Sequence, residues 1–225
     1  MARFRRLDVL LTMKRIGLVP VFYHPQTEVA RHIVDACAQS DACVVEFTNR
    51  GDHAIEVFRQ LETHCAAQLP QIILGVGSIV DAPTAALYIA AGANFVVGPV
   101  LDEPTATLCN SRKIPYCPGC GTATEIHRAE MLGVEICKIF PGGEVGGPAF
   151  IKSIKGPCPW TDLMPTGGVA PTEESLHAWF NAGAACVGMG SKLITKERVA
   201  KGDFAGLTQH ISEVLALIRR IRPAQ

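Results

Sequence analysis

The feature that most constrains the fold is a regular alternation of short apolar runs with segments of helical periodicity. Eight short apolar runs are predicted strands: Leu18–Tyr23, Cys43–Thr48, Ile72–Val76, Phe95–Val97, Ile114–Cys117, Ile136–Phe140, Asp162–Pro165 and Cys186–Met189. Helices are expected between and after them, near 27–39, 53–67, 83–91, 103–111, 122–132, 147–154, 172–182 and 204–221. A further helix is expected before the first strand, at Leu7–Ile16.

This alternation predicts the architecture as well as the elements. Strictly alternating strands and helices favour a parallel sheet, and eight such units favour a closed barrel over an open Rossmann-type sheet. With 225 residues the chain suits one sizeable core, and no linker or low-complexity stretch suggests a boundary. We therefore predict an α/β fold, a single (β/α)8 TIM barrel with an extra N-terminal helix, spanning residues 1–225 as one domain.

Charge and cysteine usage narrow the kind of partner. The chain has 21 basic and 21 acidic residues, so it offers no cationic excess for nucleic acid or for an anionic membrane. The uncharged stretch Ala82–Leu101 is interrupted by Pro83, Gly92 and Pro99, which favours a helix followed by a strand over a membrane span. Nine scattered cysteines and the lack of a signal-peptide core indicate reduced thiols in a cytoplasmic protein that binds a small molecule.

Lys138 is the most informative single residue. It alone of the lysines lies in an apolar strand window, with Ile136 and Phe140 as its neighbours at period two. If this face points into the barrel, burial would favour the neutral amine that attacks a carbonyl carbon. A structural lysine in an ion pair, with Glu46 as a possible partner, is the alternative.

Glu46 and Arg50 mark the end of the second predicted strand, where barrel enzymes place their chemistry. Glu46 is either a structural partner or a general acid/base beside the amine. Arg50 suits a substrate carboxylate, which an arginine can hold by two parallel hydrogen bonds.

Glycine-rich segments follow the last two predicted strands. Thr166-Gly167-Gly168 and Gly190-Ser191 lie where many barrels bind phosphate through backbone N–H groups, and glycine lets an anion approach the backbone closely. Cys117-Pro118-Gly119-Cys120 has the spacing of a redox pair or of half a zinc site, but no second CxxC or CxxH follows. A coincidence of structural cysteines is the favoured interpretation of this motif.

Five motifs in a fixed order carry a family resemblance: Glu46–Arg50, Gly75–Ser78, Pro118–Glu125, Lys138–Pro141 and Pro165–Val169. The chain resembles, over nearly its whole length, the 2-keto-3-deoxy-6-phosphogluconate (KDPG) aldolases, a family that includes 4-hydroxy-2-oxoglutarate (KHG) aldolases. The resemblance implies a metal-independent class I aldolase without a cofactor, usually a homotrimer, that acts on a 2-keto acid.

Carried over by motif, the resemblance also implies roles for individual residues. Lys138 corresponds to the Schiff-base lysine, Glu46 to the general acid/base and Arg50 to the carboxylate-binding arginine. The remaining expected residues are Ser78, Thr166, Phe140 and Pro99 at the substrate, and Gly167, Gly168, Gly190 and Ser191 on the phosphate side.

The sequence departs from the family pattern in two loops. Phe47–Gly51 replaces the common Thr-Leu-Arg-Thr type segment, and Pro141–Glu144 is one residue longer than the usual Pro-Ala-Glu. The expected reaction is cleavage of KDPG to pyruvate and glyceraldehyde 3-phosphate, with KHG cleavage to pyruvate and glyoxylate as a further activity. A 2-keto-3-deoxy-6-phosphogalactonate or other 2-keto acid aldolase is the alternative substrate class, and a phosphate-binding isomerase or a noncatalytic barrel is the alternative protein class.

Overall fold

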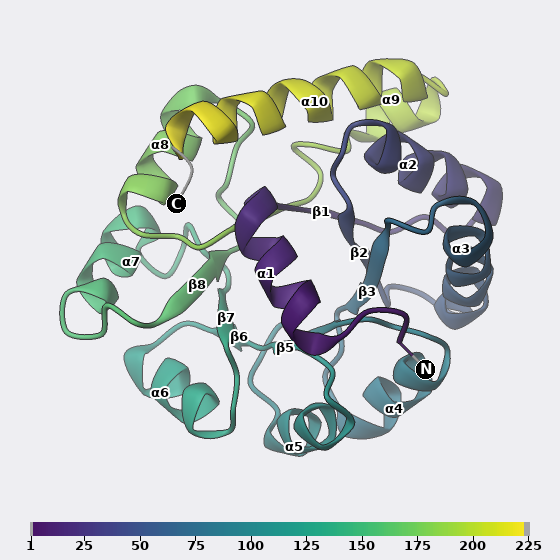
Figure 1. Ribbon diagram of the computed structural model, residues 1–225. Coiled ribbons are helices and arrows are strands. Elements are labelled where there is room, and N and C mark those ends of the chain that lie inside the picture. Colours follow the sequence, from purple (N-terminus) through teal and green to yellow (C-terminus); the bar gives the residue numbers. More distant parts are fainter. Residues whose placement is uncertain (1, 223–225) are drawn as a thin grey trace.

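The computed structural model describes residues 2–222. It shows a curled, mostly parallel sheet surrounded by helices (Figure 1). The strands are β1 (Leu18–Phe22), β2 (Val44–Thr48), β3 (Ile73–Gly77), β4 (Val96–Val97), β5 (Tyr116–Cys117), β6 (Gly119–Cys120), β7 (Ile136–Ile139), β8 (Asp162–Pro165) and β9 (Val187–Met189). They form a six-stranded sheet in the order β5-β4-β3-β2-β1-β9 and a three-stranded sheet in the order β6-β7-β8.

The expected fifth strand, Ile114–Cys117, differs from the structure. Strand pairing begins only at Tyr116 and continues beyond Pro118 as a separate segment, β6. Proline has no N–H to donate to a ladder, so the strand is interrupted there. The Pro118 carbonyl nevertheless accepts a hydrogen bond from Lys138 N at 3.0 Å, and β5 pairs with β4 while β6 pairs with β7.

The other edge of the three-stranded sheet lies beside β9. Ala185 N donates to Leu163 O at 2.9 Å, and Thr166 forms an isolated parallel bridge with Gly188. Each sheet is therefore linked by backbone hydrogen bonds or bridges to the other.

All but one of the helices surround the sheet (Figure 1). The helices are α1 (Arg6–Ile16), α2 (Thr27–Gln39), α3 (Ala54–Gln68), α4 (Ala82–Ala90), α5 (Glu103–Arg112), α6 (Ala123–Met131), α7 (Gly147–Lys155), α8 (Glu173–Asn181), α9 (Lys196–Ala200) and α10 (Phe204–Ile221). The short helix α9 was not expected from the sequence. At α6, Glu125 N donates to Thr122 Oγ1 at 3.2 Å and the Glu125 carboxylate accepts from Gly121 N, so this part of the family motif forms a helix cap.

The buried apolar side chains form two clusters. The larger packs the helices onto the outside of the sheet. The smaller fills the space inside the curled sheet, where Val9, Leu10 and Met13 of α1 pack on strand residues such as Val44 and Ile136. Helix α1 lies across this end of the strands (Figure 1), so the amino ends of the strands are covered by apolar packing.

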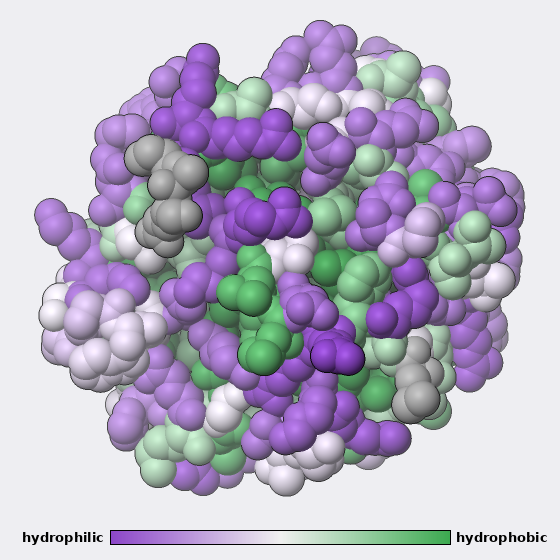
Figure 2. Space-filling model, in the orientation of Figure 1, coloured by the Kyte–Doolittle hydropathy of each residue, from purple (hydrophilic) through white to green (hydrophobic). Residues whose placement is uncertain are grey.

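The outer surface at the α1 end is mainly hydrophilic, with a small apolar area near its centre (Figure 2). Leu7 and Leu11 on α1 are among the exposed large apolar residues. Among residues 2–222, no helix is both long and apolar enough to cross a bilayer.

Candidate functional site

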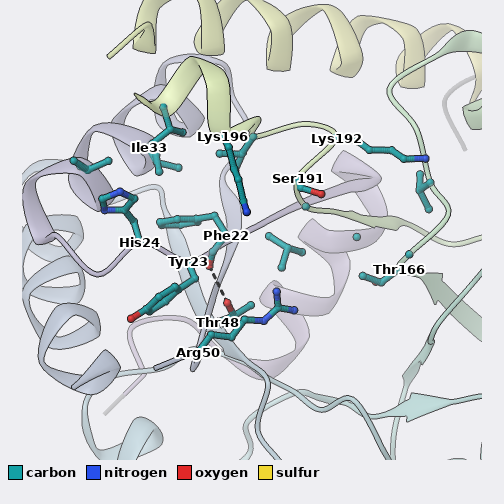
Figure 3. A pocket seen from close by; sticks show the side chains of 18 of the residues that line it. Phe22, Tyr23, His24, Ile33, Thr48, Arg50, Thr166, Ser191, Lys192 and Lys196 are labelled. Carbon is teal, nitrogen blue, oxygen red and sulfur yellow. Dashed lines mark hydrogen bonds between the residues drawn. The ribbon is translucent and has the colours of Figure 1, made fainter. Parts of the chain in front are cut away.

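A cavity of about 810 Å³ opens at the carboxyl ends of the strands (Figure 3). It therefore lies opposite α1, which covers their amino ends (Figure 1). Its walls come from the ends of β1, β2, β7, β8 and β9 and from the helices α2 and α9. The sequence-predicted site residues that line it are Arg50, Phe140, Thr166, Gly167, Gly168, Gly190 and Ser191. Lys138, Glu46, Ser78 and Pro99 do not line the cavity directly.

Lys138 lies on β7 with its side chain inside the curled sheet, because Ile136, two residues earlier, belongs to the inner apolar cluster. Only 6% of the residue is exposed. Its ammonium lies 4.7 Å from the centroid of the Phe140 ring, which lines the cavity, and a cation over an aromatic face is stabilised by the ring's negative charge density. Among residues 2–222, no ion pair joins Lys138 to Glu46.

Glu46 is a carboxylate inside the sheet, 1% exposed. Burial raises its pKa, and the positive charges of Lys138 and Arg50 offset only part of that rise. One of its oxygens, Oε2, has no hydrogen-bond partner among the described residues. A buried carboxyl with a free oxygen and a raised pKa is suited to exchange protons with a nearby group.

Gly77 explains how the Glu46 carboxyl fits in the interior. A Cβ at position 77 would overlap Glu46 Oε1, so only a glycine leaves space for the side chain. Gly77 ends β3, where it pairs with Thr48. Gly77 therefore leaves room for the acid that the neighbouring strand carries.

Arg50 and Ser78, both predicted at the substrate, lie together at the ends of β2 and β3. Arg50 Nε donates a hydrogen bond to Ser78 Oγ at 3.3 Å, and Ser78 has a positive φ of 61°. The adjacent Asn49 is anchored, since its N–H donates to Gly77 O at 2.8 Å and its side-chain oxygen accepts from the Tyr88 hydroxyl at 2.9 Å. The strand-end backbone that carries Arg50 is therefore fixed while the guanidinium stays exposed.

Thr166 and the glycines after it form the wall beside β8. Thr166 Oγ1 is buried without a hydrogen-bond partner in the described residues, although the residue lines the cavity. Gly142 N donates to Thr166 O at 2.9 Å, and a Cβ on Gly168 would lie 2.8 Å from Gly143 Cα. A side chain on Gly168 would therefore disturb the close contact between the loop after β7 and the loop after β8.

Gly190 and Ser191 begin a turn that leads from β9 to α9. The carbonyl of Gly190 accepts hydrogen bonds from Leu193 N at 2.9 Å and Ile194 N at 3.0 Å. Both residues line the cavity, and Ser191 is exposed to it. Pro99, by contrast, lies away from these loops, with its carbonyl packed so closely on Gly119 that a side chain there would overlap it.

Cys117 and Cys120, the CxxC motif, lie in different apolar clusters. Cys117 belongs to the cluster inside the sheet and Cys120 to the one between sheet and helices. Burial raises the pKa of the Cys117 thiol well above its ordinary value. No group of three or more His, Cys, Asp or Glu side chains in residues 2–222 is arranged to hold a metal ion.

Sequence reasoning missed several residues of the cavity wall. Tyr23 and His24 follow β1, Thr48 ends β2, and Lys196 begins α9. For Thr48 there was a signal, because it lies between Glu46 and Arg50 at period two and so shares their face of the strand. Lys196 had no such signal because the helix that presents it was not expected.

Comparison with known proteins agrees with this geometry. Residues 9–210 match the sequence profile of the KDPG and KHG aldolases. The chain belongs to this family.

Individual relatives cover most of the chain. It is 30% identical over 210 residues to a 2-dehydro-3-deoxy-phosphogluconate aldolase of Pseudomonas aeruginosa, covering 93% of this chain and 92% of the relative. It is 28% identical over 198 residues to the KHG/KDPG aldolase of Escherichia coli K12, covering 88% and 90%. The crystal structure of a KDPG aldolase from Legionella pneumophila, which holds pyruvate as a covalent carbinolamine, superposes with a TM-score of 0.84 at 24% identity, covering 94% and 98%.

Family membership confirms the predicted enzyme class. The protein is an aldolase, a carbon–carbon lyase.

Proposed function

We propose that this aldolase cleaves KDPG to pyruvate and glyceraldehyde 3-phosphate through a Schiff base, and KHG to pyruvate and glyoxylate by the same chemistry. The observation that carries the proposal is the pair of groups below the cavity: a buried amine, Lys138, and a buried carboxyl, Glu46, that form no ion pair with each other. The names of the curated relatives supply the substrates.

The first step requires Lys138 as a nucleophile. Its neutral amine attacks the C2 ketone of the substrate to give a carbinolamine, and loss of water gives a protonated imine. Glu46 is the acid that donates a proton to the departing hydroxyl, a role that its raised pKa supports.

The second step breaks the carbon–carbon bond. Glu46, now a carboxylate, removes the C4 hydroxyl proton, directly or through water. The C3–C4 electron pair moves into the imine, so an aldehyde leaves and an enamine of pyruvate remains on Lys138. Protonation at C3 and addition of water then release pyruvate and restore the amine.

The cavity wall supplies positions for the rest of the substrate. We assign the substrate carboxylate to Arg50, whose Nε is oriented by Ser78, and a substrate hydroxyl or phosphate oxygen to the unpartnered Thr166 Oγ1. The Phe140 ring lies beside the Lys138 ammonium, where the keto group is proposed to bind, and Pro99 remains a proposed contact of the keto-acid end through its loop.

The phosphate is proposed to lie against the glycine loops of Gly167, Gly168, Gly190 and Ser191. If these backbone N–H groups hold it, Gly190→Val should block the approach and reduce turnover of phosphorylated substrates, because a branched side chain would stand between anion and backbone. Cleavage of a short unphosphorylated 2-keto acid should survive better. Equal losses on both substrates would place the phosphate elsewhere.

Borohydride reduction tests the proposed reaction directly. Reduction in the presence of pyruvate should add a stable mass to Lys138, identified by peptide mass spectrometry, and to no other lysine. An isomerase or a noncatalytic barrel would not be trapped. Comparing kcat/KM for KDPG, its galactonate epimer and unphosphorylated 2-keto acids would then rank the substrates.

The wider organisation is also proposed from the family resemblance. We infer that the two sheets together form one closed (β/α)8 barrel, that residues 1–225 are one aldolase domain, and that the protein works as a cytoplasmic homotrimer. Light scattering coupled to size exclusion would measure the number of subunits.

A further inference from the structure

We infer that Lys196 is a specificity-determining residue that holds the far anionic group of the substrate, across the cavity from Arg50. The inference deepens the proposed function and rests on it for the orientation of the substrate. Lys196 is the first residue of α9, and it lies on the same connection from β9 as Gly190 and Ser191.

The charges around the cavity support an anion-binding site with two ends. The cationic side chains that enter it are those of Arg50 and Lys196. None of the wall residues is an aspartate or a glutamate. In a partly enclosed space without carboxylates, the potential from these cations is little compensated, so a substrate with two negative groups is favoured over one with a single group.

Lys196 is oriented toward this space. In Figure 3 its side chain extends from α9 into the cavity and its nitrogen ends near Phe22, while the Arg50 guanidinium enters from the strand end below. The neighbouring wall is apolar, formed by Phe22, Ile33 and Ile194. Lys196 is itself exposed, so its ammonium is open to an anion that enters the cavity.

The acidic residue closest in sequence to Lys196 has another partner. On α9, the Glu197 carboxylate pairs with Lys201 Nζ at 2.7 Å. Within residues 2–222, the lysine ion pairs are this one and Lys14–Asp162, and Lys196 takes part in neither. Its charge is therefore available to a ligand.

Lys192 offers a matched control on the same connection. It also lines the cavity, but Figure 3 shows its nitrogen directed away from the space that Lys196 enters. Replacing either lysine removes one positive charge from the same segment. A general effect of net charge would therefore appear in both variants, whereas a direct contact would appear only in the Lys196 variant.

The experiment compares the wild type with Lys196→Met, Lys196→Arg and Lys192→Met on KDPG and on its unphosphorylated analogue, 2-keto-3-deoxygluconate. For Lys196→Met, kcat/KM on KDPG should fall about 10- to 100-fold, the worth of one charge-assisted hydrogen bond, mainly through KM. On the unphosphorylated substrate the same variant should change less than about twofold, and Lys196→Arg should restore most of the KDPG activity.

Other results would overturn the inference. Equal losses of Lys196→Met on both substrates would indicate a structural role, and equal losses of Lys192→Met and Lys196→Met on KDPG would indicate a diffuse effect of charge. No loss on KDPG would exclude the contact. The proposed function is tested separately, because borohydride trapping of pyruvate on wild-type Lys138 does not depend on a distal anion.

Discussion

At one end of the strands, α1 seals the interior with Val9, Leu10 and Met13; at the other, the same strands end in charged side chains, hydroxyls and glycines around an open cavity. Along β7 the change takes two residues, from Ile136 in the apolar cluster to Lys138 below the cavity. Because side chains alternate along a strand, residues two apart share the inner face at different depths. Residues near the amino ends of the strands therefore stabilise the fold, whereas residues near the carboxyl ends form the candidate site.

The largest effect is expected at the open end. Lys138→Met should abolish turnover and borohydride trapping, because it removes the nucleophile while a similar volume keeps the interior filled. Circular dichroism and thermal unfolding should show an intact fold. A variant that still forms a reducible pyruvate adduct would move the nucleophile to another lysine.

Glu46→Gln tests whether the open end sacrifices stability for chemistry. Its kcat should fall about 10²- to 10⁴-fold, because the amide cannot exchange protons as the carboxyl does. The fold should become more stable near neutral pH. Burial raises the folded-state pKa of Glu46, so its favourable contribution is complete below the ordinary value of 4.5 and is lost as pH rises through the folded-state pKa.

Urea unfolding of the wild type and Glu46→Gln across about pH 4 to 8 would measure this difference. The gap in unfolding free energy should widen toward neutral pH and narrow in acid. If the Glu46→Gln variant kept the wild-type kcat over about pH 6 to 9, Glu46 would have a structural role instead of a catalytic one. If the difference in unfolding free energy between the two proteins did not change with pH, burial of the Glu46 carboxylate would not destabilise the fold.

Met13→Ala tests the closed end. Met13 on α1 is fully buried, so truncation should lower the unfolding free energy by about 2–5 kcal/mol while kcat/KM of the folded enzyme stays unchanged. Leu11→Ala is the matched control on the same helix: that side chain is 65% exposed, and the change should stay within about 0.5 kcal/mol. Loss of catalysis in folded Met13→Ala would show that the ends are coupled.

Gly75 and Gly77 on β3 give the smallest and sharpest comparison. A Cβ on Gly75 would overlap the Phe95 ring of the inner cluster, whereas one on Gly77 would overlap the Glu46 carboxyl. Each alanine should cost about 1–3 kcal/mol through overpacking. Only Gly77→Ala should also lower kcat, which is measured below the unfolding temperature of both variants. An equal loss of kcat in Gly75→Ala would show that Gly77 has no special relation to Glu46.

The sequence predicted much of the fold because periodicity reports burial directly. The strand Asp162–Pro165 and the helices at 27–39 and 204–221 have the predicted bounds. The fifth strand could not be placed by apolar content alone, since its interruption depends on the missing N–H of Pro118 and on a change of pairing partner.

The sequence could predict which site residues face the interior, because that depends on their position along a strand. It could not predict which side chains contact one another. Lys138 and Glu46 could be placed in the interior from their apolar neighbours. The missing ion pair between them, and the Phe140 ring beside the ammonium, depend on three-dimensional packing that no spacing encodes. Lys196 required knowledge of α9, a helix of five residues that is too short for a periodic signal.

The contact between the loops after β7 and β8 limits how this enzyme can diversify. With Gly142 N bonded to Thr166 O, and Gly168 packed on Gly143 without room for a side chain, neither loop can be lengthened or decorated independently of the other. Mutations that adapt the active site to a new aldehyde are therefore expected to accumulate on the opposite wall, in the segment after β1 and at the start of α9. In laboratory evolution, one wall of the cavity should tolerate substitutions and the other should not. Libraries centred on Tyr23, His24 and Lys196 should therefore yield more folded variants than libraries centred on Gly142, Gly143 and Gly168.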